Sequence, residues 1–453
     1  MKFIGAYQVR GLLGRGGMGK VYLVASPHRS GLWALKLLEP NPFLVEVWGE
    51  ALVRRHFARE AQALAELSHP RLVRVVDQGE EAGRPFYVME HFCRSLGGEI
   101  GEGARVEDPS RPLDPAQALA YLAQTLAGVA ALHRAGLVHR DLKPHNLMLD
   151  RAGGVRVSDL GLSLLRGERD ATPRSLKVGS PFYAAPEQEA QPDTAGPATD
   201  FFSLGATLFR LVTGVLPEPG GPPASSLNPH LDAAWDRFLD RALQPDPGAR
   251  YADAGEMLAA LRELAQGWEQ TWERTCRLAA PPPRPRETSP APVRARPAKV
   301  SQGQAPAAFG LDPLGRPRHY AAPAWQRRGQ VVEDPGRGLT WQWSGAGQGL
   351  GWAEAFAEAE RANQAAWAGR RDWRLPTVAE LLTLLAPPYP GRRCGAPRFD
   401  PAVGAVWSAD ARSFTSAWVV SLEAGFVGWR HRSCLVEVKL VAGGEPGAGA
   451  AIS

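Results

Sequence analysis

A proline-rich, basic segment divides this sequence of 453 residues into two parts of different character. Residues 281–297 contain seven prolines, and residues 281–300 carry a net charge of +4, nearly all of the chain's +5. Such a composition buries too little apolar surface to form a core and favours extended polyproline conformations. We therefore expect a flexible linker over residues 273–308. The rest of the chain is close to neutral, so a general nucleic-acid-binding surface is not expected.

The part before this linker changes from strands to helices along its length. Residues 1–90 read mostly as strands and turns, with one helical stretch near 48–67 where apolar residues recur at helical spacing. A second helix is predicted over 114–135, because Asp114 is a suitable N-cap and Pro115 suits the first helical position. Helical patterns then dominate from about 186 to 272. The order predicts a small strand-rich portion followed by a larger helical one.

The part after the linker, residues 309–442, contains nine of the chain's 14 tryptophans. Short alternating runs such as 417–422 predict strands, and Thr377 with Glu380 forms a capping box that opens a short helix over 378–385. Most of these tryptophans are expected to fill the core of a small domain, and the alternative is that some are exposed anchors for a partner. The tail 443–453, which is rich in glycine and alanine, is expected to be disordered.

A glycine-rich motif lies near the N-terminus. Residues 14–21 read Gly-Arg-Gly-Gly-Met-Gly-Lys-Val, the form GxGxxGxV. Glycines at such spacing let backbone N–H groups approach phosphate oxygens, although a plain turn or a dinucleotide fold has the same letters. A dinucleotide fold needs a helix directly after the glycines, and residues 21–24 read as a strand. We therefore favour a hairpin over a nucleotide, with Gly14, Gly16 and Gly19 facing the phosphates.

An apolar strand that follows this motif carries a lysine. Lys36 stands in Trp33-Ala34-Leu35-Lys36, where it is a candidate to hold nucleotide phosphates, and a snorkelling surface lysine is the alternative. Its ammonium would need an acidic partner, and Glu60 on the next predicted helix is positioned for that role. Glu60 taken alone reads as an ordinary solvated helix residue.

The most specific motif is the segment His139-Arg140-Asp141-Leu142-Lys143-Pro144-His145-Asn146. A carboxylate, a lysine two residues on and an amide five residues on form a compact loop for phosphoryl transfer. Asp141 would accept a hydroxyl proton, Lys143 would neutralise the γ-phosphate, and Asn146 would bind magnesium. Asp159 follows the predicted strand 155–157 and is the second candidate magnesium ligand, because hard cations take carboxylate oxygens.

Together with Ala185-Pro186-Glu187, Asp200 and Arg250, these motifs resemble the catalytic domain of protein kinases. The resemblance is to the eukaryotic-like (Hanks-type) serine/threonine kinases of bacteria, and it covers residues 7–266 of an expected domain 1–272. It implies a bilobal α+β fold with ATP and Mg²⁺ between the lobes. It also implies contacts with the nucleotide from residues beyond the glycines and Lys36: Val21, Ala34, the gatekeeper Met89, and a hinge from Glu90 to Cys93.

The same resemblance implies two structural contacts and some departures. Glu187 and Arg250 would form a buried ion pair, and Asp200 would hold the backbone of the catalytic loop. Leu160 and Ser180 replace the family's usual Phe and Thr, and residues 97–112 look like a loose insertion near the pocket mouth. Arg140 would pair with a phosphate on the activation segment, for which the candidate positions are Thr172, Ser175 and Ser180.

The tryptophan-rich part is similar to a second family. Trp373-Arg374-Leu375-Pro376-Thr377, preceded by Leu339-Thr340-Trp341, resembles the Lcl_C family over about 325–442. That family looks related to C-type-lectin-like folds, which are small mixed α/β domains. The resemblance implies a domain over 309–442 that recognises a ligand or a protein partner.

These observations favour an ATP- and Mg²⁺-dependent serine/threonine protein kinase that phosphorylates itself and unidentified protein substrates. A catalytically silent scaffold and a small-molecule phosphotransferase are the alternatives. Lys36, Asp141, Asn146 and Asp159 argue against the first, and Lys143 with the Ala-Pro-Glu segment argues against the second. Four scattered cysteines, no signal peptide and no apolar run of membrane-spanning length favour the cytoplasm.

Overall fold

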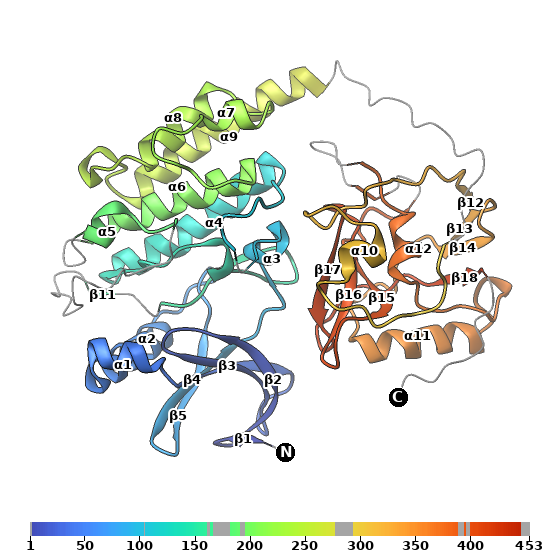
Figure 1. The fold of residues 1–453 in the computed structure, drawn as a ribbon, viewed down its shortest axis with the longest axis horizontal. Coiled ribbons are helices and arrows are strands. Elements are labelled where there is room, and N and C mark those ends of the chain that lie inside the picture. The colour runs from blue at the N-terminus through green and yellow to red at the C-terminus, as the bar shows by residue number, and fades with distance from the viewer. Residues whose placement is uncertain are drawn as a thin grey trace. The chain divides into compact units, whose positions relative to one another are not determined.

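The computed structural model describes most of the chain, namely residues 2–103, 105–160, 164–165, 182–190, 195–276, 293–387, 394–395 and 399–444. The chain divides into two compact units, residues 1–278 and 279–453 (Figure 1). The candidate phosphorylation sites Thr172, Ser175 and Ser180 lie outside the described residues, as do residues 445–453 of the predicted tail. The tail prediction is wrong at Gly443, which ends a β-strand. No helix in the described parts of the chain is both long and apolar enough to cross a bilayer.

A six-stranded antiparallel sheet forms the first lobe of the N-terminal unit. Its strand order is β1-β2-β3-β4-β6-β5, with the bounds β1 Phe3–Ile4, β2 Tyr7–Arg15, β3 Gly19–Ala25, β4 Leu32–Leu38, β5 Val75–Glu81 and β6 Arg84–Glu90. Two helices follow β4, namely α1 (Pro42–Trp48) and α2 (Glu50–Glu66). Val53, Phe57 and Leu64 lie on one face of α2 and are buried, so the helix predicted near 48–67 is confirmed.

Helices form the second lobe. They are α3 Leu96–Ile100, α4 Pro115–Arg134, α5 Pro186–Ala190, α6 Pro197–Thr213, α7 Ala224–Leu227, α8 Ala233–Ala242 and α9 Ala254–Cys276. Short strands join them near the lobe boundary: β7 Arg94–Ser95, β8 Leu137–Val138, β9 Leu147–Leu149, β10 Val155–Val157 and β11 Leu164–Leu165. Asp114 accepts hydrogen bonds from the amides of Ala116 and Gln117, as its predicted N-cap role requires. Leu122, Leu126 and Val129 of α4 are fully buried. Figure 1 shows the blue strand-rich lobe below these helices, as the bilobal prediction requires.

The described residues of the C-terminal unit form two small antiparallel sheets and three α-helices. One sheet has the order β12-β13-β14-β18 and the other β15-β16-β17. The strands are β12 Gln326–Arg328, β13 Val331–Asp334, β14 Leu339–Gln342, β15 Ala405–Ala411, β16 Ser416–Ser421, β17 Phe426–His431 and β18 Val441–Gly443. The helices are α10 Ala305–Phe309, α11 Trp352–Gln364 and α12 Val378–Leu382, and α12 opens with the predicted capping box of Thr377 and Glu380.

The tryptophans of this unit mostly pack inside it. Five of the nine are buried: Trp341, Trp352, Trp373, Trp407 and Trp418. The indole N–H of Trp407 donates to the Leu350 carbonyl at 2.8 Å, so its polar edge is satisfied in the core. Trp429 on β17 is 41% exposed. The core role expected of most tryptophans is therefore the observed one.

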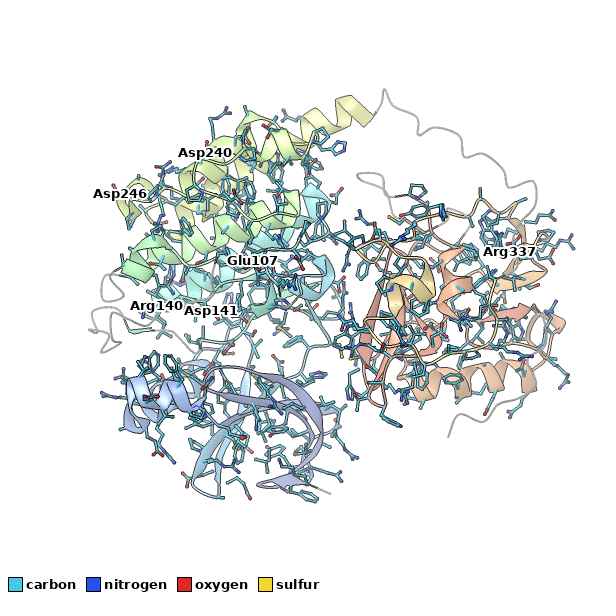
Figure 2. The ribbon with its side chains drawn as sticks, in the orientation of Figure 1. Glu107, Arg140, Asp141, Asp240, Asp246 and Arg337 are labelled. Carbon is cyan, nitrogen blue, oxygen red and sulfur yellow. The ribbon has the colours of Figure 1, made fainter. Side chains whose placement is uncertain are left out.

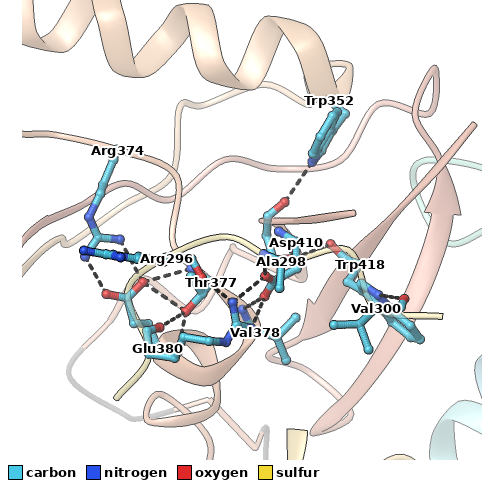
Figure 3. Close-up of polar contacts among 12 residues, drawn as sticks. Arg296, Ala298, Val300, Trp352, Arg374, Thr377, Val378, Glu380, Asp410 and Trp418 are labelled. Carbon is cyan, nitrogen blue, oxygen red and sulfur yellow. Dashed lines mark hydrogen bonds and ion pairs between the residues drawn. The ribbon is translucent and has the colours of Figure 1, made fainter. Parts of the chain in front are cut away.

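The flexible linker expected over 273–308 is wrong for residues 293–308, which pack on the C-terminal unit. The Asp410 carboxylate accepts from the Ala298 amide, and the Thr377 hydroxyl donates to the Arg294 carbonyl. Figure 3 shows Ala298 beside Asp410 and Val300 beside Trp418. The indole of Trp418 donates to the Val300 carbonyl at 2.9 Å, and Val300 is 7% exposed. The composition of this segment predicted a flexible chain because the segment cannot form a core by itself. Contacts with residues far along the chain hold it in place instead.

The loose insertion expected over 97–112 is also wrong. Residues 96–100 form α3, and Ser110 and Arg111 are buried. The Arg111 guanidinium donates to the Gly98 and Glu99 carbonyls, and the Leu113 amide donates to the Leu211 carbonyl of α6. The glycines predicted a loose chain, but Gly101 adopts φ 73° at the end of α3, where a side chain would also strike Arg111.

Candidate active site

The glycine motif forms the turn between β2 and β3. Gly14 pairs with Val21 across the hairpin, and the Gly16 amide donates to the Gly19 carbonyl at 2.8 Å. A Cβ at Gly19 would lie 2.1 Å from the Leu37 carbonyl oxygen, so only glycine fits there. A Cβ at Gly14 would meet no atom within 4 Å, so packing does not explain that glycine. Because strand β3 follows the motif directly, the hairpin interpretation is confirmed and the dinucleotide fold is excluded.

Lys36 lies between two carboxylates from distant parts of the chain. Its ammonium is 2.9 Å from both carboxylate oxygens of Glu60 on α2 and 2.7 Å from Oδ1 of Asp159. The side chain of Glu60 is 1% exposed and that of Lys36 is 10% exposed. The surface-lysine and solvated-glutamate alternatives are therefore wrong for this pair. One ammonium therefore pairs with two carboxylates, and the three groups carry one excess negative charge when all of them are ionised.

The electrostatics of this triad keep the lysine charged. Burial alone would lower the pKa of Lys36, but the carboxylates of Asp159 and Glu60 raise it well above its ordinary value. Lys36 in turn holds the pKa of Asp159 well below its usual range. Burial raises the pKa of Glu60 to about 7, although the charge of Lys36 acts to lower it. The site therefore presents an ammonium and an ionised Asp159 at neutral pH.

Asp200 of α6 holds the backbone of the catalytic loop, as the kinase resemblance implied. Its carboxylate accepts hydrogen bonds from the amides of His139, at 2.9 Å, and Arg140, at 2.8 Å. Arg140 adopts φ 67°, a strained value for a residue with a side chain. The His139 ring is buried and lies 3.1 Å from the Ser158 carbonyl, so this histidine packs the loop. Figure 2 labels Arg140 and Asp141 on this loop, at the boundary of the two lobes.

Asp141, Lys143 and Asn146 converge on that loop. The Lys143 ammonium is 2.9 Å from Oδ2 of Asp141, and the Asn146 amide nitrogen donates to the same oxygen at 3.0 Å. The Asn146 nitrogen also donates to the Asp141 carbonyl at 2.8 Å. The side chain of Asp141 is 12% exposed. Two donors thus orient one carboxylate, which is the arrangement required of a group that accepts a proton from a bound hydroxyl.

Backbone bonds bring Asp159 next to this loop. The amide and hydroxyl of Ser158 both donate to the Asn146 carbonyl, at 2.9 and 3.0 Å. Asp159 adopts φ 64° and Leu160 is 1% exposed. Leu160 therefore fills an apolar site as the family's Phe would. The Asp159 side chain, which is 47% exposed, offers a carboxylate. The nitrogen of Asn146 is used within the loop, and its amide oxygen can accept a cation. These oxygen donors fit Mg²⁺.

The remaining residues expected at the nucleotide pocket lie on or beside β3, β4 and β6. Ala34 of β4 pairs with Leu23 of β3 and with Met89 of β6, and it is 4% exposed. Glu90 ends β6, and Cys93 directly precedes β7. Contacts of Val21, Ala34, Glu90 and Cys93 with a nucleotide stay predictions.

Glu187 and Arg250 form the ion pair that the kinase resemblance implied. Both oxygens of Glu187 lie 2.7 Å from nitrogens of Arg250, whose side chain is fully buried. The Arg250 guanidinium also donates to the Ala198, Gln244 and Pro245 carbonyls. This pair joins the start of α5 to the start of α6 and the turn before α9.

A family comparison agrees with this geometry. The sequence profile described as a protein kinase domain matches residues 7–251. The chain belongs to the protein kinase family. A second profile, described as the Lcl C-terminal domain, matches residues 330–442 of the tryptophan-rich unit. Both resemblances drawn from the sequence are therefore confirmed.

Individual relatives are bacterial serine/threonine-protein kinases. The kinase PrkC of Bacillus subtilis is 31% identical over 280 residues, which is 57% of this chain and 40% of PrkC. The kinase PksC of Streptomyces coelicolor is 35% identical over 274 residues, 56% of this chain and 48% of PksC. The chain thus spans less than half the length of either relative. Among solved structures, the kinase domain of Mycobacterium tuberculosis PknI is 27% identical, with a TM-score of 0.46, over 58% of this chain and 97% of that one.

Sequence reasoning missed one buried polar cluster beside the catalytic loop. Glu102, Tyr183 and Arg210 meet there, and all three are buried. Arg210 stands in the apolar run Leu208-Phe209-Arg210-Leu211-Val212 of α6. A charge within an apolar helix stripe requires a buried partner, and that signal was available in the sequence. The partner itself could not be located from sequence, because it lies 108 positions earlier.

Proposed function

We propose that this chain is an active serine/threonine protein kinase that transfers the γ-phosphate of ATP to protein hydroxyls, its own included. The observation that carries the proposal is the convergence of Lys36, Asp141, Asn146 and Asp159 within one bilobal unit. The relatives named above, which are serine/threonine-protein kinases by name, support the same class of activity.

On this proposal the residues of the first lobe hold the nucleotide. The glycine hairpin lets the backbone approach the phosphates closely, because Gly14 and Gly16 place no Cβ between the backbone and the ligand. Lys36, fixed by Glu60, offers a permanent positive charge to the same oxygens. Magnesium, held by Asn146 and Asp159, would neutralise phosphate charge as it develops in the transition state.

The catalytic loop would act on the acceptor. Asp141, oriented by Lys143 and Asn146, positions the substrate hydroxyl and accepts its proton, and Lys143 stabilises negative charge on the transferred group. Catalysis in such a site is mostly positioning and electrostatics, since few covalent steps fall to the protein.

For the tryptophan-rich unit we propose a recognition role, with the exposed Trp429 as one aromatic anchor. Arg412 stacks on the Trp429 ring at 4.0 Å, so this edge of the sheet offers an aromatic face beside a cation.

The test is phosphoryl transfer from radiolabelled ATP by the full chain, with Asp141→Asn and Lys36→Met as variants. We expect labelling of the wild-type chain and of a generic protein acceptor, and a loss of at least about 10²-fold for Asp141→Asn. Mass spectrometry would then locate labelled hydroxyls, including any among Thr172, Ser175 and Ser180. A wild-type chain that binds ATP but labels nothing would support the silent-scaffold alternative. Normal transfer by Asp141→Asn would show that the site is assigned wrongly.

A further inference from the structure

Glu102 is a buried acid beside the catalytic loop to which the kinase resemblance gave no role. It follows α3, and the Glu102 amide donates to the Gly97 carbonyl at 2.9 Å, which fixes the turn. Its side chain is 1% exposed. Burying a carboxylate away from water costs free energy unless a nearby cation and hydrogen-bond donors compensate for the lost hydration. The residues that contact Glu102 therefore show which parts of the chain it holds together.

Those partners come from three separate segments. Tyr183 donates its hydroxyl to Oε2 of Glu102 at 2.5 Å, and Nε of Arg210 lies 3.6 Å from the same oxygen. Nε2 of His145, on the catalytic loop, lies 3.6 Å from Oε1. Burial and the carboxylate of Glu102 together raise the pKa of Tyr183 far above its ordinary value, so Tyr183 stays a hydrogen-bond donor.

Arg210 places a buried cation beside the Glu102 carboxylate. Its side chain is fully buried on α6, and its terminal nitrogens donate to the carbonyls of Val106, Asp108 and Gly214. These carbonyls satisfy hydrogen bonds but carry no net charge. The carboxylate of Glu102 supplies the charge that a buried guanidinium requires.

The same cluster is joined to the site through backbone contacts. The hydroxyl of Ser203 on α6 donates to the Tyr183 carbonyl at 2.8 Å, and the Gln188 amide donates to the Arg140 carbonyl at 2.7 Å. A Cβ at Gly97 would lie 2.5 Å from the His145 ring, so α3 packs directly on the catalytic loop. Glu102 thus links α6, the 182–188 segment and the loop that carries Asp141. Lys36, Glu60 and Asp159 lie outside these contacts.

We propose that Glu102 is a positioning residue for phosphoryl transfer, which acts by holding Tyr183 and the catalytic loop in register with α6. This inference rests on the proposed kinase function and adds to it a buried link from residues 97–112. The contacts of Glu102 reach the catalytic loop, where the substrate hydroxyl would bind, and do not reach Lys36, Glu60 and Asp159. Loss of these contacts should therefore lower kcat without changing nucleotide affinity.

Two conservative variants test the link. Tyr183→Phe removes one hydroxyl and leaves Glu102 beside Arg210. Glu102→Gln removes the charge and keeps an oxygen that can accept from Tyr183. The matched control is Tyr251→Phe, which removes another buried tyrosine's hydrogen bond, to the Phe238 carbonyl at 3.2 Å. Transfer from radiolabelled ATP to myelin basic protein gives kcat, and a fluorescent ATP analogue gives nucleotide affinity and the fraction of folded sites.

We expect Tyr183→Phe to lower kcat about 10-fold per folded site, because small displacements of positioning groups cost that much or more. Nucleotide affinity should not change, and Tyr251→Phe should match the wild type in both readouts. Per folded site, Glu102→Gln should lower kcat less than Tyr183→Phe does, because the amide oxygen still accepts from Tyr183. The missing counter-charge for Arg210 should instead lower the fraction of folded sites. The double variant should be no slower than Tyr183→Phe alone, since both changes act through one contact.

Two results would overturn the inference while leaving the kinase function intact. One is wild-type kcat for Tyr183→Phe. The other is a double variant whose fold-loss in kcat equals the product of the losses in the two single variants, which would mean that Glu102 acts independently of Tyr183. A wild-type chain that binds the analogue but transfers no phosphate would overturn the proposed function, and this inference with it.

Discussion

Arg294 and Asp410 form a bidentate ion pair across 116 positions of sequence, with two hydrogen bonds of 2.8 and 2.9 Å. The Asp410 side chain is fully buried and also accepts from the amides of Ala298 and Val378, each at 2.7 Å. The Thr377 hydroxyl donates to the Arg294 carbonyl at 2.6 Å. Residues 293–300 therefore belong to the core structure of the C-terminal unit, although the Lcl profile begins only at residue 330.

We predict that Arg294→Ala loosens this segment. The change leaves the buried Asp410 carboxylate with two amide donors and no cation, and such a loss is strongly destabilising locally. Limited proteolysis with mass spectrometry should find new cleavage within 293–300. Arg296→Ala is the control, because Arg296 is an exposed neighbour in the same segment. Equal protection of both variants would show that the ion pair does not hold the segment.

A second prediction concerns Glu60. Glu60→Gln removes one of the two carboxylates that hold Lys36 and leaves Asp159 as its partner. We expect phosphoryl transfer to fall by about 10–10²-fold, because the ammonium is no longer preorganised toward the phosphates. Steady-state kinetics with radiolabelled ATP would measure the loss.

Glu66→Gln provides the comparison for that experiment. Glu66 is exposed at the end of the same helix, where it accepts a hydrogen bond from Gln62. Its kinetics should match the wild type. If Glu60→Gln were as active as Glu66→Gln, the Lys36–Glu60 pair would have no part in catalysis.

The sequence alone points to the candidate catalytic residues because each occurs within a short, ordered motif, and their catalytic roles stay predictions. The spacing of Asp141, Lys143 and Asn146 places the three side chains on one loop, whatever the rest of the chain does. Lys36 and Glu60 lie 24 positions apart, and their pairing was inferred because a buried ammonium needs an acidic partner and Glu60 lies on the next predicted helix. The strand after Gly19 could be predicted from its apolar run, which was enough to exclude a dinucleotide fold.

What could not be predicted depends on long-range partners. Residues 293–308 and 97–112 are rich in proline or glycine, and local composition describes both as loose. Their order comes from Asp410 and Trp418 in one case and from Arg210 and the Leu211 carbonyl in the other. Contacts between residues about a hundred positions apart leave no local pattern, so a sequence without homologues cannot reveal them.

A third prediction follows from the state of Asp200. Burial alone would raise its pKa, but hydrogen bonds and charge from His133, with the amide of Arg140, hold the pKa below its ordinary value. A carboxyl with a lowered pKa in the folded state contributes stability that is fully present above its unfolded value of about 4. That contribution is lost as the pH falls and the group takes up a proton.

The measurement is the difference in free energy of unfolding between the wild type and Asp200→Asn, from urea titrations at several pH values. The difference should be largest at pH 5 and above and should shrink toward pH 3, as the wild-type carboxyl becomes neutral. Asp240→Asn, on α8, serves as the comparison because Asp240 is exposed. A difference for Asp200→Asn that stayed constant down to pH 3 would contradict the lowered pKa.

The last prediction concerns Arg250, whose buried guanidinium ties Glu187 to three backbone carbonyls. Arg250→Met keeps much of the apolar stem but leaves the Glu187 carboxylate without its cation. We expect the free energy of unfolding of the kinase unit to fall by about 3–5 kcal/mol, as when one partner of a buried pair is removed. Arg250→Lys should recover only part of this loss, because an ammonium cannot form two parallel bonds with a carboxylate. Arg241→Met, which removes a half-exposed pair with Glu256, should change stability little. Urea unfolding followed by far-ultraviolet circular dichroism would rank the three variants. Equal free energies of unfolding for Arg250→Met and Arg241→Met would show that the buried pair with Glu187 stabilises the unit no more than the half-exposed pair does.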